Sequence, residues 1–303
     1  MRNTAASYLV LVACGRVGFD SRPRDAASDA APCTWSALSA PQKLPAVVQS
    51  TDDDWTPTPT RGGLDLYFYS YRPGGVGGAD LWHAQRATLA DSFAAPAPVS
   101  ELDTTSNEGT PTLTADGLVI LFARTVGTSG EIFEAARASS ADAFGPAMQV
   151  AELSSGTANG DPFVTGDGLR LVFTSARAGG LGGLDIYETS RASLADAFAA
   201  PVARVELNSS VDEYGPTLSS DGLEIFFASV RTGGLGGFDV YTARRGSVDD
   251  PFGPPQLVRE VSSAMDDVGT RLSADGTTLY LDYDTLTSGG ANADLWVATR
   301  SCN

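Results

Sequence analysis

One pattern repeats five times along this chain and constrains the fold more than any other feature. A glycine that precedes a short apolar segment recurs with steps of 54, 51, 54 and 54 residues, at Gly63, Gly117, Gly168, Gly222 and Gly276. A fixed period of this length indicates a repeat architecture, in which each copy is one supersecondary unit. The 303 residues are therefore expected to build most of their structure from five similar units.

Each copy reads as four short β-strands separated by turns. An Asp-Gly pair precedes the second strand in copies two to five, and Asp-Gly between alternating apolar residues favours a tight hairpin. The second strand alternates, as Leu169, Leu171 and Phe173 show. A Gly-rich loop then leads to a third strand, and a segment such as 198–201 leads to a fourth.

Four-stranded units in five copies predict an all-β fold, a five-bladed β-propeller with antiparallel blades. The chain enters at what reads as a fourth strand, Leu38 to Val48, and leaves at a third strand, Asp294 to Thr299. We therefore expect the N-terminal strand to become the outermost strand of the last blade. Such closure leaves no free sheet edge, which suppresses edge-to-edge aggregation.

The repeats resemble the WD40-like repeats of TolB-type propellers over about residues 35–303. The resemblance rests on Arg-x-Gly-Gly-x-Gly-Gly-x-Asp, which occurs at 72–80, 177–185 and 231–239. Copies two and five depart from it, because Val126 and Thr285 stand in place of the arginine. The resemblance implies interaction with other proteins of the bacterial envelope.

The N-terminal segment has the pattern of a targeting signal. Arg2, an apolar run, and then Leu11-Val12-Ala13-Cys14 resemble the lipobox of bacterial lipoproteins. This resemblance implies a signal peptide at 1–13, cleavage before a lipidated Cys14, and, because Gly15 follows, the outer membrane. No run reaches the ~18 apolar residues of a membrane-spanning helix, so the membrane is expected to be contacted only through the lipid.

The domain boundaries follow from composition and from two cysteines. Residues 15–32 have little to bury, so we expect a disordered tether at 14–32 and the propeller at 33–303. Cys33 and Cys302 both align with the repeat position of Ser193, from opposite ends of the chain. Ring closure would bring them together, which predicts a disulfide and an oxidising compartment; the alternative is two unpaired thiols.

The charge balance excludes several functions. The chain has 20 Lys and Arg against 37 Asp and Glu, a net charge of −17. This charge opposes binding to nucleic acid, which needs a basic face, and to anionic lipid surfaces. The single histidine, His83, aligns with Glu134, Glu188, Thr242 and Val297, which favours an exposed position over a catalytic one. No catalytic residue, cofactor or metal site is predicted, and no Asp-x-Asp-x-Asp-Gly calcium loop occurs in the sequence.

Acidic residues recur before the first strand of each copy. They are Asp53, Asp54, Glu108, Asp161, Asp212, Glu213, Asp266 and Asp267. Alternate loops of a blade share one face, so these acids are expected to ring one mouth of the central channel. They could bind a cation, an amine or a basic protein surface, or they could pair with Arg72, Arg177 and Arg231 to brace the loops. Because copies two and five lack that arginine, Glu108, Asp266 and Asp267 are expected to be the least neutralised.

The expected function is that of a non-catalytic, lipid-tethered monomer that binds an envelope protein or a cell-wall glycan. A carbohydrate-binding module and a carboxylate-based glycosidase are the alternatives. A glycosidase needs two unlike carboxylates about 5–9.5 Å apart, one with a raised pKa. Acids that are equivalent between copies count against it. An asymmetric set of carboxylates in a deep pocket would favour the enzyme, and a shallow ring with arginine partners would oppose it. The aspartates that open the third strands are expected to bond nearby backbone: Asp80, Asp185, Asp239 and Asp294.

Overall fold

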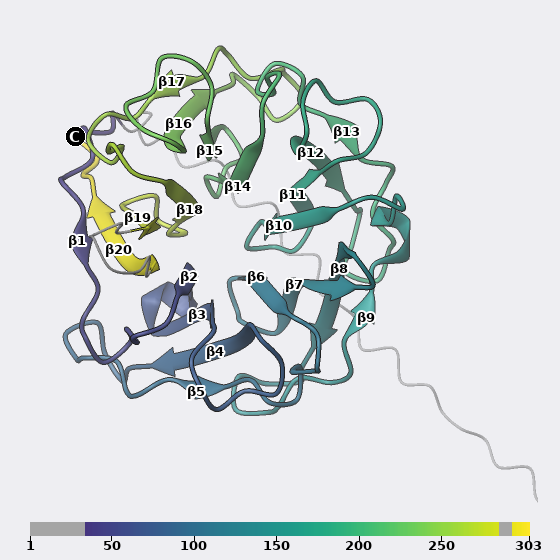
Figure 1. Cartoon of the computed structure of the whole chain (residues 1–303), viewed down its shortest axis with the longest axis vertical. Helices are drawn as coiled ribbons and strands as arrows, with labels where there is room; N and C mark the ends of the chain where they lie inside the picture. Colours follow the sequence, from purple (N-terminus) through teal and green to yellow (C-terminus); the bar gives the residue numbers. More distant parts are fainter. Residues whose placement is uncertain (1–33, 285–292) are drawn as a thin grey trace, which may run out of the picture. The chain divides into compact units, whose positions relative to one another are not determined.

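A computed structural model describes residues 34–284 and 293–303, and the unit from Trp35 to Asn303 is a five-bladed β-propeller (Figure 1). Each blade is a four-stranded antiparallel sheet, so the all-β, five-bladed prediction is confirmed. The helical turns within the described ranges are η1 (Arg61–Gly63) and η2 (Ala151–Leu153). Across these residues no helix has the length and apolar character needed to cross a membrane.

The innermost strands β2, β6, β10, β14 and β18 surround the axis in Figure 1. From the axis outward, blade 1 consists of β2 (Asp54–Thr60), β3 (Asp65–Ser70), β4 (Asp80–Gln85) and β5 (Ala97–Pro98). Blade 2 consists of β6 (Glu108–Leu113), β7 (Val119–Val126), β8 (Ser129–Ala136) and β9 (Met148–Gln149). Blade 3 consists of β10 (Asn159–Val164), β11 (Arg170–Ser175), β12 (Asp185–Ser190) and β13 (Val202–Ala203). Blade 4 consists of β14 (Glu213–Leu218), β15 (Glu224–Ser229), β16 (Asp239–Arg244) and β17 (Gln256–Leu257). The fifth is β18 (Asp267–Leu272), β19 (Thr278–Asp284), β20 (Ala293–Thr299) and β1 (Gln42–Lys43).

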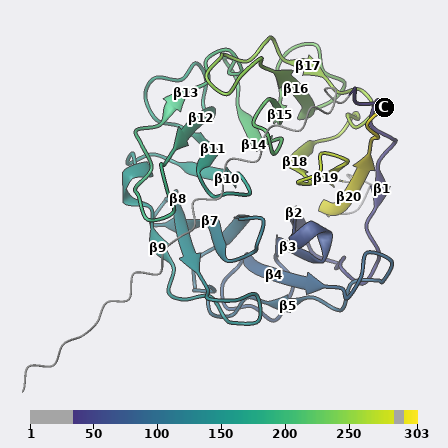
Figure 2. The same ribbon diagram turned by 180° about the vertical axis from the view of Figure 1, so that it is seen from behind.

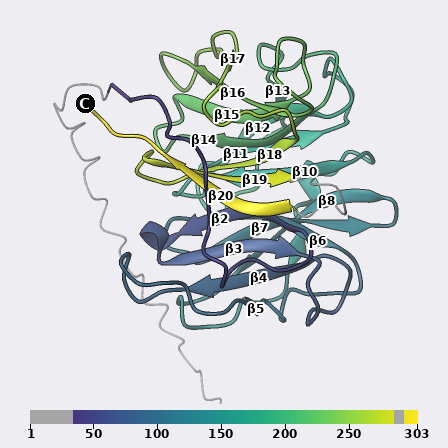
Figure 3. The same cartoon turned by 60° about the vertical axis from the view of Figure 1, so that its left-hand side comes forward.

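The ring closes as expected, through the first strand of the chain. Strand β1 pairs with β20, with Gln42 opposite Val297, and Figure 3 shows the two ends of the propeller side by side. The closing strand is two residues long, shorter than the segment 38–48 expected to form it. Trp35 also forms an isolated antiparallel bridge with Cys302.

Several predictions fall on residues outside the described ranges. These are the signal peptide at 1–13, the lipidated Cys14, the tether at 14–32 and Cys33, the expected disulfide partner of Cys302. The chain ends do meet at the bridge between Trp35 and Cys302. The lipid anchor and the disulfide therefore stay predictions.

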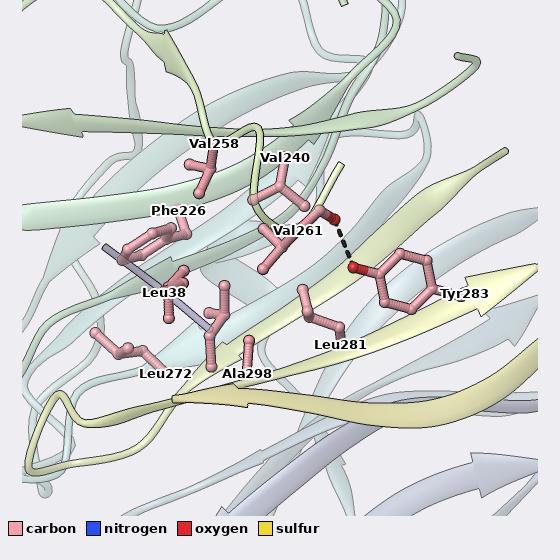
Figure 4. Close-up of a cluster of buried hydrophobic side chains, with 10 residues drawn as sticks. Leu38, Phe226, Val240, Val258, Val261, Leu272, Leu281, Tyr283 and Ala298 are labelled. Atoms are coloured by element: carbon pink, nitrogen blue, oxygen red, sulfur yellow. Dashed lines mark hydrogen bonds between the residues drawn. The ribbon is translucent and has the colours of Figure 1, made fainter. Parts of the chain in front are cut away.

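The hydrophobic core lies between neighbouring blades. Figure 4 shows one cluster, in which Phe226 and Val240 of blade 4 meet Leu272 and Leu281 of blade 5, together with Leu38 from the N-terminal segment. The Tyr283 hydroxyl donates to the Val261 carbonyl at 2.5 Å in the same cluster. Because both faces of each sheet are covered by adjacent blades, the second strand of blade 4 is buried along its whole length.

An arginine after each third strand explains why one glycine marks the repeat. Its Nε donates to the carbonyl of the turn glycine, and its guanidinium lies 4.2–4.5 Å from an aromatic ring centre. The arginines are Arg86, Arg137, Arg191, Arg245 and Arg300. Each turn glycine has a positive φ between 70° and 86°, which side chains rarely adopt. These hairpins form the face seen in Figure 2.

Candidate functional site

The Gly-rich loops are pinned by the aspartates that open the third strands. Asp80 accepts hydrogen bonds from the Val76 and Gly77 amides at 3.2 and 3.1 Å. Asp185 and Asp239 hold the loops of blades 3 and 4 in the same way. The expected backbone bonding is confirmed for these three aspartates. It leaves one apolar side chain per loop facing solvent: Val76, Leu181 and Leu235, which are 60%, 56% and 44% exposed.

The loop glycines are required because the next blade lies against them. A Cβ on Gly77 would stand 2.2 Å from the Ser106 carbonyl, and one on Gly182 would stand 2.5 Å from the Val211 carbonyl. Any side chain at these positions would clash with backbone. The Gly-rich loop and the approach to the next blade therefore form one continuous rim.

Four of the predicted acids are the first residues of innermost strands, and they are buried. Asp54, Glu108, Glu213 and Asp267 each have 0% exposure. Each accepts a backbone hydrogen bond from the residue four positions earlier. They lie beneath the rim rather than forming an open acidic ring.

Arginines neutralise most of this buried layer. Arg72 pairs with Asp54 at 2.6 Å and Arg231 with Glu213 at 2.9 Å, so the bracing interpretation holds for these blades. The expectation that Glu108 is poorly neutralised is wrong, because Arg124 Nε lies 2.8 Å from its carboxylate. Arg124 comes from the strand position directly opposite Glu108, not from the Gly-rich loop.

Asp267 is the acid of this layer with no ion pair inside the described ranges, and Thr285 lies outside them. It accepts the Ser263 amide and hydroxyl at 2.6 and 2.9 Å. Burial raises the pKa of Asp267 to about 7, and the nearby Asp239 and Asp266 charges also raise it.

Three further predicted acids link adjacent blades at the rim. Asp53 accepts the Ala293 amide at 3.1 Å, Asp212 the Leu184 amide at 2.8 Å, and Asp266 the Phe238 amide at 2.9 Å. These acids are partly exposed, so they also supply negative charge to this face.

Asp161 does not occupy the repeat position of the other predicted acids. The residue of blade 3 that is equivalent to Glu108 is the neutral Asn159, which receives Arg177 Nη2 at 2.8 Å. Asp161 lies two residues further on, inside a β-bulge, with φ +47°. Bulges redirect side chains and are frequent beside functional sites. Every innermost strand has such a register shift at this point.

The channel axis holds charged residues that do not repeat. Arg271 stands where the other blades have Thr58, Thr112, Phe163 and Thr217. It is fully buried, donates to the Thr270 and Pro162 carbonyls, and its Nε has no hydrogen-bond partner among the described residues. Burial lowers the pKa of Arg271 to about 10, against the opposing charges of nearby acids.

Two carboxylates, Asp161 and Asp282, interact electrostatically with the guanidinium of Arg271. Asp282 accepts the Thr56 and Gly269 amides at 2.8 and 2.6 Å, and burial raises its pKa to about 6. Asp161 accepts the Thr174 hydroxyl at 3.2 Å. Burial also raises the pKa of Asp161, while Arg271 lowers it. The axis therefore carries two acids for one base.

A cavity of about 270 Å³ opens beside Asp161 on the side of the Gly-rich loops. Tyr69, Tyr71 and Tyr214 line it, and so does the hydroxyl of Thr110, which is buried without a partner in the described structure. Glu108 reaches the same cavity. The hairpin-turn side of the channel holds a second cavity, of about 600 Å³, and Arg271 lines it.

One group of acids has the geometry of a possible cation site. Asp80, Asp103 and Glu108 each place a carboxylate oxygen within 4.8 Å of the others. Oxygen donors of this kind suit hard divalent cations. However, Asp80 already accepts backbone amides, and Glu108 already accepts Arg124 and Thr104. Burial raises the pKa of Asp103 to about 7, and the charges of Asp80 and Glu108 add to that effect.

Sequence reasoning missed Arg271 and Asp282 because it searched for acids that recur. The useful signal was the opposite one: a charged residue at an inward position whose equivalents are neutral. Asp282, for example, aligns with Tyr69, Ala123, Thr174 and Ala228. His83 bonds Asp65 at 2.8 Å and stacks on Tyr67, away from this cavity.

Comparisons with known proteins define the class by fold. No family model and no curated protein matches the sequence. Among solved structures, TolB from Acinetobacter baumannii is 15% identical, with a TM-score of 0.55 over 84% of this chain and 56% of that one. A thermostable family-43 glycoside hydrolase is 14% identical, with a TM-score of 0.56 over 84% and 91% of the two chains. The catalytic domain of the Coprinopsis cinerea GH62 α-L-arabinofuranosidase is 12% identical, with a TM-score of 0.53 over 89% and 97%.

The chain is thus a five-bladed β-propeller, and its structural neighbours include both TolB and glycoside hydrolases. It spans little more than half of the TolB chain. At these identities the likeness concerns the fold, which is compatible with a binding scaffold and with a glycosidase.

Proposed function

We propose that the chain is a non-catalytic binding scaffold that docks a partner protein on the face of its Gly-rich loops. The observation that carries the proposal is the set of exposed apolar side chains Val76, Leu181 and Leu235. Single exposed apolar residues are ordinary. Here three occupy the same repeat position on one face, and each lies on a loop that an aspartate holds by backbone hydrogen bonds. Fixed apolar contacts surrounded by polar groups suit a protein interface.

The charge of this face indicates the kind of partner. Asp53, Asp212 and Asp266 lie at its rim, in a chain with a net charge of −17. A basic protein surface would complement it and associate faster for that reason. The proposal places the scaffold as a monomer in the cell envelope, at the outer membrane, held by lipid on Cys14 and closed by a Cys33–Cys302 disulfide.

A glycosidase is the second candidate, because Asp161 and Glu108 line one cavity and several structural neighbours are glycoside hydrolases. The environment of Glu108 counts against the glycosidase. This carboxylate is fully buried and accepts hydrogen bonds from the Thr104 amide and hydroxyl and from Arg124. Release of arabinose from arabinoxylan by the full chain, abolished by Asp161→Asn, would support this enzyme and contradict the non-catalytic proposal.

Site-specific photo-crosslinking in the bacterial envelope tests the docking proposal. A photoreactive amino acid replaces Leu181 in the full chain, and in a matched variant it replaces Leu194. Leu194 is 48% exposed and lies between β12 and β13, at the opposite face of the blade. We expect one discrete protein adduct from position 181 and none from position 194.

A second variant separates docking from chance proximity. Combining the photoreactive residue at 181 with Val76→Ser and Leu235→Ser removes two of the three apolar contacts while leaving exposed positions that tolerate polar residues. The adduct should fall at least fivefold. Equal adducts from positions 181 and 194, or an adduct that is indifferent to the serine substitutions, would overturn docking on this face.

A further inference from the structure

Among residues 34–284 and 293–303, the central cavity on the Gly-rich side lies beside two carboxylates that share one guanidinium. Near the axis, Asp161 and Asp282 both interact electrostatically with Arg271. Asp282 is fully buried and accepts the bulge amides of Thr56 in blade 1 and of Gly269 in its own blade. Asp161 accepts the Thr174 hydroxyl and the Gly215 amide, and it is the one of the two acids that lines the cavity. A buried carboxylate without full compensation is costly, so a positive charge is favoured at the cavity beside Asp161.

The walls of the cavity suit an organic cation. Tyr69, Tyr71 and Tyr214 present aromatic surface, and ammonium and guanidinium groups are attracted to such rings. The Thr110 hydroxyl, buried and unpartnered among the described residues, adds a hydrogen-bond acceptor. Arg124 also lines the cavity, but Glu108 and the Leu102 carbonyl already engage it.

The size of the cavity limits its occupant. Pockets that enclose drug-sized ligands span about 300–1,000 Å³. At about 270 Å³ this cavity is just below that range and fits one side chain better than an extended ligand. The loops that end at Ala79 and Leu184 border it, so a protein docked on the Gly-rich face would lie directly above.

We propose that this cavity receives one lysine or arginine side chain of the docked partner, with its charge against Asp161 and its methylene groups against the tyrosines. The inference rests on the proposed docking function and names the anchor of that interface. One fully inserted side chain of this kind is a typical hot spot. A sugar unit in the cavity is the competing occupant that the test must separate.

Small probes test the pocket without the partner. The full chain is titrated calorimetrically with N-acetyl-arginine methylamide, N-acetyl-lysine methylamide, the citrulline analogue, arabinose and xylose. Citrulline matches arginine in shape but is neutral. We expect the arginine or lysine probe to bind at least tenfold more tightly than citrulline and the sugars. Equal binding of arginine and citrulline, or binding of a sugar alone, would overturn the proposal.

Variants assign the effect to the pocket. Asp161→Asn should weaken the cationic probe at least tenfold, whereas Asp221→Asn, which removes one exposed charge at a hairpin turn, should change it less than twofold. If Asp161→Asn does not fold, Tyr71→Ser serves, because Tyr71 is 47% exposed and contributes little to packing. It should weaken the probe at least threefold. Unchanged binding in both pocket variants would overturn the inference.

The two proposals fail separately. An adduct at position 181 with no preference for cationic probes would leave the docking function standing and reject the anchor. Cationic probes that bind through Asp161 in a chain that gives no adduct would retain the pocket and reject docking on this face.

Discussion

The junction between blades 1 and 2 and the junction between blades 3 and 4 use the same positions with different charges. The first contains Asp80, Asp103 and Glu108, and the second contains Asp185, Asn208 and Glu213. Each has one arginine on its glutamate, Arg124 in the first and Arg231 in the second. The two junctions therefore differ by one carboxylate, with the surrounding fold held constant.

The neutral residue fits where the acid does not. Asn208 accepts the Ile186 amide at 2.8 Å and returns a hydrogen bond to the Ile186 carbonyl at 3.2 Å. Asp103 has no hydrogen to donate, and its pKa is raised to about 7 by burial and by Asp80 and Glu108. The comparison indicates that burial and the two neighbouring carboxylates oppose ionisation of the third acid, Asp103.

Removing the arginine of each junction should give the largest difference in stability between the two junctions. Arg124→Met should destabilise the fold by about 3–5 kcal/mol, because buried acids lose their partner. Arg231→Met should cost about 2–3 kcal/mol, because one acid fewer is left behind. Both guanidiniums also lie over two aromatic rings, so the lost ring contacts are matched. Urea unfolding at pH 8 measures both; equal losses would show that the third acid is irrelevant.

Placing a third carboxylate in the junction between blades 3 and 4 should destabilise the fold as Asp103 does in the first junction. Asn208→Asp should destabilise the fold by about 2 kcal/mol at pH 8, since it loses a donor and adds a charge near Asp185 and Glu213. The new carboxyl would have a raised pKa in the fold, so the loss should shrink as the pH falls toward 4.5. Asn208→Ala is the control, because it removes the hydrogen bonds without adding charge. A pH-independent loss in Asn208→Asp would contradict the electrostatic account.

The sequence was sufficient for the fold because the determinants of a blade are local. The Asp-Gly turns, the alternating second strand and the recurring glycine each act within a few residues, and their period fixed the number of blades. The closing strand was also predictable, since the chain begins at a fourth strand and ends at a third. Its length was not, because pairing of β1 with β20 depends on how far the N-terminal segment stays beside the last blade.

The site was harder to predict because the repeat pattern does not show how deeply each side chain is buried. Glu108 was expected at the channel mouth and poorly neutralised, but it is fully buried and paired with an arginine on the opposing strand. Asn159 was passed over for Asp161 because only acids were counted. Arg271 and Asp282 lie on different strands and meet only when the five blades close around one axis. Such convergence is a property of the whole ring, not of any one copy.

Removing the surplus acid should have the smallest effect and the clearest sign. Asp103→Asn places in blade 1 the residue that blade 3 already uses, and should stabilise the fold by about 1 kcal/mol at pH 8, discounted for partial exposure. The native carboxyl has its pKa raised from 3.8 to about 7, so the folded state holds its proton more tightly than the unfolded state does. Its penalty is absent below pH 4, grows between pH 4 and 7, and is complete above pH 7. The gain from asparagine should follow that rise, and Asp116→Asn, at an exposed turn, should show none. Urea unfolding of both variants between pH 4 and 8 measures this; a gain that is constant with pH would mean that asparagine acts through its extra hydrogen bond and not through the lost charge.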